Sequence, residues 1–203
     1  MESMNPLEQS LSDRLQEADI FAATPSVQIQ AYSQGRKKID LKMGDEYVYY
    51  DLASLTKILF TTTVCMRLLD SQKLDLEQKV NYYLPRWQSD RTTVRQLLQH
   101  HAGLHWWNNY YDRLMAKGGT RVEKREHLFD LLMDEKARKN PSQATYSDLD
   151  FLLLGYIIER AADLELLSLW EQLHYELKLE TLHFCVDNQP VYERNLYAPT
   201  EDC

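Results

Sequence analysis

One serine and one lysine stand at a spacing that suits nucleophilic catalysis. Residues 51–57 read DLASLTK, the only SxxK pattern in the chain, and an apolar segment follows at once. We expect that segment to form a helix whose first turn carries Ser54, where free backbone N–H groups and the helix dipole favour a developing negative charge. Lys57 returns to the same face one turn later. It could exchange a proton with the serine hydroxyl if burial lowered its pKa.

An ordinary structural role is the alternative for both residues. Ser54 could simply cap the helix while Lys57 extends into solvent. The four-letter pattern also arises by chance in a chain with this many serines and lysines. These residues alone therefore leave both interpretations open.

A second polar group precedes another apolar run, residues 149–158. It consists of Tyr146, Ser147 and Asp148. Ser147 or Asp148 could cap a helix there, with Asp150 completing a capping box. A cap does not account for Tyr146. A tyrosine beside a lysine ammonium can hold a lowered pKa and act as a general base toward a serine hydroxyl.

Five segments in their order resemble one known family, the class C β-lactamase-like and penicillin-binding-protein-like serine hydrolases. They are DLASLTK, LDLEQKVNYYLP at 74–85, TTVRQLLQHHAGL at 92–104, TYSDLDFLLLGYIIE at 145–159 and YAPTE at 197–201. The resemblance covers roughly residues 20–201 and implies a β-lactamase/transpeptidase-like fold. It also implies that Ser54 is acylated, that Lys57 and Tyr146 manage its proton, and that Asp148 hydrogen-bonds nearby.

The chain departs from the family pattern at Asp148 and in the third motif, and also at Ala102, which replaces a serine common in the HxSGL segment. Asp148 replaces the commoner asparagine, and a carboxylate near Lys57 favours the charged amine, which shifts the expected base role toward Tyr146. The family's third motif, a KTG or HxG on a late strand beside an oxyanion-hole N–H, has no counterpart after Asp148. Residues 117–120 read KGGT, but their charged flanks and neighbouring helical segments predict a loop.

Two further groups could take part in binding. Trp106, Trp107 and Asn108 could border a substrate groove, although aromatic clusters also pack cores and partners. His100 and His101 could suggest a metal or a base. Adjacent histidines point to different sides of a helix, however, and no third ligand is spaced to join them, so we expect a structural role.

The hydrophobic pattern predicts an α+β chain, mostly helical after an N-terminal β-hairpin, with the C-terminal strands of its sheet missing. We expect one incomplete domain over 1–203, with the hairpin and the start of the nucleophile helix in 20–57 and a mainly helical region in 58–203. A hairpin is expected over 26–43. The helix from Leu55 has almost no polar face and is expected to be buried on all sides. Other helices are expected to begin after Pro6 and to span 92–101, 122–138 (closed by Asn140), 149–162 and 166–177.

Composition limits the functional classes. The 203 residues are 44% hydrophobic and carry a net charge of −8, which disfavours nucleic acid as a partner. No apolar run is long enough for a membrane span, and the start lacks a signal-peptide pattern, so the chain as given is expected to be cytoplasmic, or periplasmic if a leader was removed. Cys65, Cys185 and Cys203 suggest neither a disulfide framework nor a zinc site, and Cys65 is expected in the core. No cofactor or metal is indicated.

The leading hypothesis is a cofactor-free serine hydrolase that acts on a β-lactam, a D-Ala-D-Ala peptide or a small ester. A non-catalytic fragment or pseudoenzyme that binds a partner or ligand through the same scaffold is the alternative. A split enzyme completed by another polypeptide is a third possibility. An incomplete sheet leaves strand edges and apolar surface uncovered. We therefore expect self-association or a complementing polypeptide, and weak activity alone.

Overall fold

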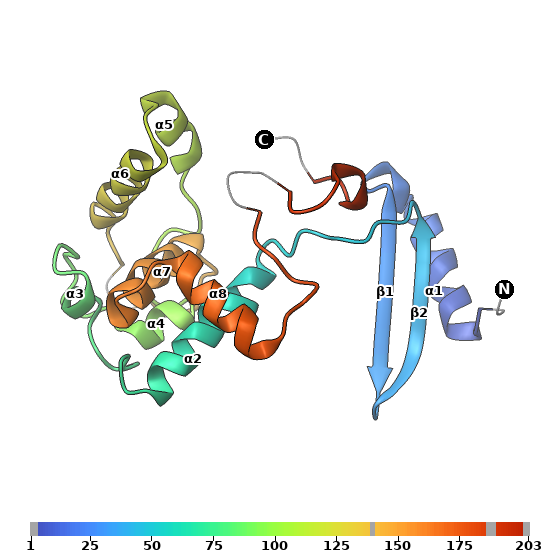
Figure 1. Cartoon of the computed structure of the whole chain (residues 1–203), viewed down its shortest axis with the longest axis horizontal. Helices are drawn as coiled ribbons and strands as arrows, with labels where there is room; N and C mark the ends of the chain where they lie inside the picture. Colours follow the sequence, from blue (N-terminus) through green and yellow to red (C-terminus); the bar gives the residue numbers. More distant parts are fainter. Residues whose placement is uncertain (1–3, 139–140, 186–189, 201–203) are drawn as a thin grey trace. The chain divides into compact units, whose positions relative to one another are not determined.

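The computed structural model describes residues 4–138, 141–185 and 190–200, so Asn140, Glu201 and Cys203 lie outside the described residues. The chain divides into two compact units. Met1–Leu52 and His183–Cys203 form the first unit, and Ala53–Leu182 form the second. Figure 1 shows a β-hairpin and an N-terminal helix in the first unit and a set of helices in the second.

The first unit is built on an antiparallel hairpin of β1 (Ser26–Ser33) and β2 (Arg36–Gly44), paired from Ser26 opposite Gly44. This confirms the predicted hairpin. Its turn contains Gln34 and Gly35 at φ 50° and 71°, and positive φ at both residues suits the twist of a tight hairpin. Among the described residues β1 and β2 form a sheet of two strands, and so the sheet has no third strand there.

Helix α1 (Pro6–Glu17) packs along β2. Asn5 caps it in a capping box with Glu8, and Pro6 stands in the first turn, where its missing N–H costs nothing. A Glu8 carboxylate oxygen also accepts the Asp40 N–H at 2.8 Å, which satisfies a backbone donor on the outer edge of β2. The predicted N-terminal helix is therefore present and lies against the hairpin.

The C-terminal residues of the first unit return to the segment after the hairpin. A short 3-10 helix (Arg194–Leu196) leads into a bridge between Tyr49 and Tyr197, and the Ala198 N–H donates to the Tyr49 carbonyl at 2.9 Å. Another 3-10 turn, Ile20–Ala22, joins α1 to β1. The rings of Tyr49 and Tyr192 stack with their centroids 4.9 Å apart.

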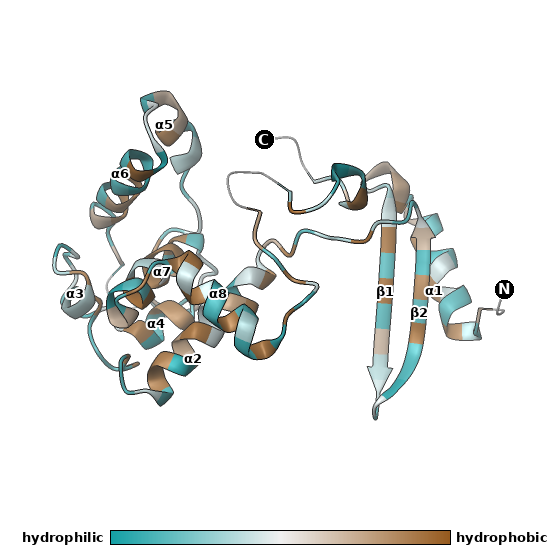
Figure 2. Ribbon diagram, viewed as in Figure 1, coloured by the Kyte–Doolittle hydropathy of each residue, from teal (hydrophilic) through white to brown (hydrophobic). Residues whose placement is uncertain are grey.

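The second unit is helical around a central α7 (Asp148–Ala162). Leu153, Leu154 and Ile157 on α7 are fully buried, and Figure 2 shows apolar residues recurring along α7 and its neighbours. The other helical elements are a π-helical stretch (Lys57–Thr62), α2 (Thr63–Asp70), α3 (Val80–Tyr83), α4 (Val94–Leu98), α5 (Tyr110–Lys117), α6 (Arg121–Met133) and α8 (Leu166–Leu177). Within the described ranges, none of the helices is both long and apolar enough to cross a bilayer.

The predicted α+β architecture, mostly helical after an N-terminal hairpin, is confirmed, with differences at helix ends. Helix α8 has the predicted bounds, whereas α4 is shorter than predicted because the backbone leaves the helix and turns to φ 53° at His100. Helix α5 was not predicted. In the KGGT segment Lys117 is the last residue of α5, whereas Gly118, Gly119 and the cap residue Thr120 form the predicted loop to α6.

The expectation that the helix after Ser54 is buried on all sides is wrong. Phe60, Cys65 and Leu68 are buried in the core, and Phe60 packs edge-on against Trp170 of α8. Ile58 and Met66 are each 63% exposed, and Leu55 and Leu59 are also exposed. Helices α7 and α8 cover only one side of this helix. These four exposed side chains leave an apolar surface on the helix.

Candidate active site

Ser54 lies at the point where the chain turns into the helix. Helical backbone begins at Leu55 and runs without a break to Asp70. The preceding residue, Ala53, has φ 42°, a left-handed conformation that costs a non-glycine residue energy and is concentrated at functional sites. The turn is closed by the Lys57 N–H, which donates to the Ser54 carbonyl at 3.0 Å. Ser54 therefore stands at a helix N-terminus on a strained backbone.

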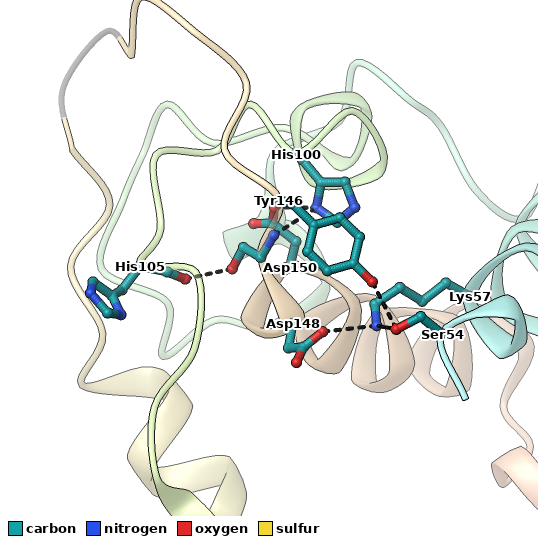
Figure 3. A network of polar contacts seen from close by, with 8 residues as sticks. Ser54, Lys57, His100, His105, Tyr146, Asp148 and Asp150 are labelled. Atoms are coloured by element: carbon teal, nitrogen blue, oxygen red, sulfur yellow. Dashed lines mark hydrogen bonds and ion pairs between the residues drawn. The ribbon is translucent and has the colours of Figure 1, made fainter. Parts of the chain in front are cut away.

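The structure brings the four predicted residues Ser54, Lys57, Tyr146 and Asp148 together (Figure 3). The Lys57 ammonium donates to Ser54 Oγ at 3.1 Å, and the Tyr146 hydroxyl lies 2.8 Å from the same oxygen. Lys57 Nζ also forms an ion pair with an Asp148 carboxylate oxygen at 2.8 Å. The proton between the tyrosine and the serine can reside on either oxygen, because both groups are hydroxyls.

The π-helical stretch replaces the regular α-helix expected behind Ser54. The Thr62 hydroxyl donates to the Lys57 carbonyl at 2.9 Å, and the Thr63 hydroxyl donates to the Ile58 carbonyl at 3.1 Å. Each bond reaches back five residues and so supports the wider turn. Such widened turns occur frequently at functional sites, and this one carries Lys57 as its first residue.

The pKa values of Lys57 and Tyr146 move in opposite directions. Burial acts to lower the pKa of Lys57, but hydrogen bonds to Asp148 and Tyr146 outweigh it and hold that pKa above its usual value. The hydrogen bond to Ser54 and the neighbouring Lys57 ammonium lower the pKa of Tyr146. The lysine is therefore held as a cation, and Tyr146 loses its proton more readily than an ordinary tyrosine does.

Two residues near the start of α7 differ from the predicted helix caps. Ser147 occupies the cap position, but its side chain makes no capping bond. Its hydroxyl donates instead to the His105 carbonyl at 2.6 Å. Asp150 does not complete a capping box, since its side chain is buried and lies 3.0 Å from His100 Nδ1. These polar groups fix the segment that presents Tyr146 and Asp148 and leave the helix end without a side-chain cap.

His100 is the residue at this site whose contacts the sequence did not predict. Its ring lies 4.6 Å from the Tyr146 ring, and its Nδ1 accepts the Ser147 N–H at 3.2 Å. His101 points elsewhere and contacts the Pro141 carbonyl at 2.9 Å, so the two histidines diverge as expected. The sequence did contain an indication of the His100 contact. Asp150 is a carboxylate among the apolar residues of α7, and a buried carboxylate requires a hydrogen-bonding partner.

Trp106 and Trp107 lie beside the second polar group and are both exposed, with ring centroids 5.9 Å apart. The Trp106 carbonyl accepts the Asp148 N–H at 2.9 Å, which joins this segment to the start of α7. The Asn108 amide donates to Glu135, which also accepts from the Tyr110 hydroxyl. The tryptophan rings thus present a free apolar surface, whereas Asn108 is engaged in a protein contact.

Cys65 is buried in the core as expected, and burial raises the pKa of its thiol to about 12. Among the residues that the structure describes, no three or more histidine, cysteine or acidic side chains are grouped as a metal site requires.

Comparisons with known proteins agree with this fold. The chain resembles a penicillin-binding protein homologue from Pyrococcus abyssi, described as octameric, with a TM-score of 0.68 and 18% identity over 95% of this chain and 46% of that one. A class C beta-lactamase solved with cefoxitin gives a TM-score of 0.67 at 18% identity and covers 94% of this chain and 55% of that one. The fold is therefore that of the penicillin-binding proteins and class C beta-lactamases.

The family model for Beta-lactamase matches residues 42–189, and the chain belongs to the beta-lactamase family. An N-acetylmuramyl-L-alanine amidase of Bacillus subtilis is 28% identical over 73% of this chain and 40% of its own length. A putative D-alanyl-D-alanine carboxypeptidase of Salmonella paratyphi B is 28% identical over 54% of this chain and 28% of its own. The chain thus spans less than half the length of these curated relatives.

Proposed function

We propose that the chain is the N-terminal and helical part of a serine hydrolase that acts through acylation of Ser54. The observation that carries the proposal is the convergence of Lys57 and Tyr146 on one serine oxygen at 3.1 and 2.8 Å. A helix cap does not require either contact. Such an arrangement of nucleophile, proton acceptor and cation is what acyl transfer needs.

The pKa directions support Tyr146 as the general base. Its phenolate would take the Ser54 proton while Ser54 Oγ forms a bond to the acyl carbon, and the leaving group would then take that proton from Tyr146 as its bond to the acyl carbon breaks. The Lys57 ammonium would stabilise both the phenolate and the serine oxygen, and Asp148 would hold Lys57 charged and in place. Water would release the acyl group in a second, equivalent step.

The names of the relatives support a small acyl substrate: a β-lactam, a D-Ala-D-Ala peptide or an ester. The curated relatives are named as an amidase and a carboxypeptidase, and one structural relative holds cefoxitin. We place Trp106 and Trp107 at the border of the substrate groove, because their exposed rings adjoin the segment that carries Asp148. Asn108 would support that border through Glu135.

The family's third motif, which lies beside an oxyanion-hole N–H, has no counterpart in the sequence of this chain. No KTG or HxG follows Asp148 in the sequence, and a single oxyanion-hole donor contributes about 100- to 1000-fold to the rate. The exposed apolar side chains of Leu55, Ile58, Leu59 and Met66 favour a covering partner. We therefore propose that 1–203 is one incomplete domain, which self-associates or binds a complementing polypeptide. The same surface favours the alternative, a non-catalytic scaffold that binds a partner.

A hydrolysis assay with nitrocefin, a D-Ala-D-Ala peptide and a p-nitrophenyl ester tests the proposed function. We expect slow turnover of at least one of them, complete loss of that turnover in Ser54→Ala, and no change in Ser10→Ala, which alters an exposed serine on α1. Light scattering on the same sample reports self-association. Turnover that persists in Ser54→Ala contradicts the proposal, and no turnover of any substrate by the wild type favours the non-catalytic alternative.

A further inference from the structure

The segment that carries Tyr146 is held by His100 at two points. The His100 carbonyl accepts the Thr145 N–H at 2.8 Å, and its Nδ1 accepts the Ser147 N–H at 3.2 Å. The residues on either side of Tyr146 are thus both bonded to one histidine. His100 can place its carbonyl and its ring in this way because it adopts φ 53°, a conformation that histidine tolerates better than most side chains.

The hydrogen bonds at Nδ1 determine where the protons are. Because Nδ1 faces the Ser147 N–H, it must be unprotonated, and the ring carries its proton on Nε2. Asp150 Oδ2 lies 3.0 Å from the same nitrogen, so this contact is a hydrogen bond only if the carboxyl carries the proton. Asp150 Oδ1 is buried and has no hydrogen-bond partner among the residues that the structure describes, a position that suits a neutral acid better than a carboxylate.

The ring of His100 also contacts two aromatic rings near Lys57. Its centroid lies 4.6 Å from that of Tyr146 and 5.2 Å from that of Phe151. The Lys57 ammonium is 5.2 Å from the Tyr146 ring and 5.9 Å from the Phe151 ring. A shift of His100 would therefore move the tyrosine on whose position the Ser54 hydroxyl contact depends.

We propose that His100 is a positioning residue, which in its neutral Nε2–H form, bonded to a protonated Asp150, fixes the 145–147 segment and so aims the Tyr146 hydroxyl at Ser54. The inference rests on the proposed function, because Tyr146 is the base there. His100 itself touches neither Ser54 nor the acyl group.

The surroundings of His100 favour its neutral form. Burial, followed by the Lys57 ammonium, lowers the pKa of His100, and the Asp148 carboxylate opposes this shift without outweighing it. Burial raises the pKa of Asp150 to about 8. Protonation of His100 would remove the acceptor of the Ser147 N–H and place a second cation beside Lys57, so the segment would loosen on acidification.

Long-range ¹H–¹⁵N spectra of the ¹⁵N-histidine-labelled full chain test the protonation state directly. The His100 signals are assigned by their loss in His100→Asn. We expect an unprotonated Nδ1 and a protonated Nε2 at pH 7, with a titration midpoint below that of an ordinary histidine. A protonated Nδ1 at pH 7, in either the neutral or the charged ring, overturns the proposal.

The positioning role is tested by the rate at which a fluorophosphonate labels Ser54. Asparagine and glycine both tolerate positive φ, but only asparagine retains an acceptor near the position of Nδ1. We expect His100→Gly to slow labelling by about 10- to 100-fold, and His100→Asn to recover much of that loss. His101→Asn, the matched control, is expected to label at the wild-type rate.

Equal rates in all variants, or equal losses in His100→Gly and His100→Asn, contradict the role of the acceptor. Thermal melting of each variant separates this loss from unfolding. If the wild type is not labelled at all, the proposed function fails. The ¹H–¹⁵N spectra would still test the protonation state of His100, which does not depend on labelling.

Discussion

Replacing Lys57 with methionine is expected to slow acylation of Ser54 by about 100- to 10,000-fold, the range typical of lost acid–base assistance. Methionine has a similar length but no charge, so Ser54 Oγ loses the ammonium donor and Asp148 loses its ion pair. The Lys57 ammonium also helps to lower the pKa of Tyr146. Without it that pKa rises, and the pH at which acylation reaches its half-maximal rate should move upward.

The measurement is the rate of fluorophosphonate labelling between pH 6 and pH 10, followed by intact mass. Lys136→Met is the matched control, because Lys136 is exposed in the segment after α6. It should label as the wild type does. A Lys57→Met chain with the wild-type rate and pH profile would remove Lys57 from the proposed mechanism.

Replacing Asp150 with asparagine is expected to stabilise the helical unit at alkaline pH. Burial raises the pKa of Asp150 to about 8, far above the value of about 3.9 for an unfolded aspartate. The folded state therefore binds a proton that the unfolded state releases. The stability this contributes is fully present below about pH 4 and is lost as the pH rises to about 8. Each pKa unit corresponds to about 1.4 kcal/mol, so the loss amounts to several kcal/mol.

Asparagine cannot ionise, and its amide can donate to His100 Nδ1 as the neutral carboxyl does. The free energy of unfolding of Asp150→Asn should therefore exceed that of the wild type at pH 8, and the difference should shrink toward pH 4. All four tryptophans lie in Ala53–Leu182, so urea titrations followed by tryptophan fluorescence report on this unit. Asp90→Asn, at a side chain 88% exposed, is the control. A difference that does not change with pH would show that Asp150 is ionised in the folded chain.

Much of the fold could be predicted because local sequence signals specify it. The alternation of Val27, Ile29 and Ala31 and the glycine of the turn determine the hairpin. Helix α8 could be placed from its apolar stripe. The grouping of Ser54, Lys57 and Tyr146 could be predicted from the family resemblance and from the three-residue spacing of Ser54 and Lys57 on a helix. The contact between Ser54 and Lys57 forms even though the helix has a π-helical turn there.

Other features depend on which surfaces meet in three dimensions, and a local pattern does not specify that. The apolar helix after Ser54 has enough hydrophobic residues for complete burial, yet Ile58 and Met66 are exposed because α7 and α8 cover only one side. The sequence suggested a capping role for Asp150. Its contact is instead with His100, fifty residues away, and a local pattern does not specify such a contact. Helix α5 was not predicted because it begins among aromatic residues that show no regular apolar period. Its capping residue, Asn109, was the sequence feature that indicated a helix start.

The central claim, that Ser54 is an activated nucleophile, is tested most directly by locating a covalent adduct. The full chain is incubated with a fluorophosphonate or a fluorescent penicillin, and the modified residue is identified by intact mass and peptide mass spectrometry. We expect one adduct, on Ser54, and none in Ser54→Ala, because Ser54 combines a helix N-terminus with contacts to Lys57 and Tyr146. An adduct on another serine, or one that survives in Ser54→Ala, would contradict the assignment.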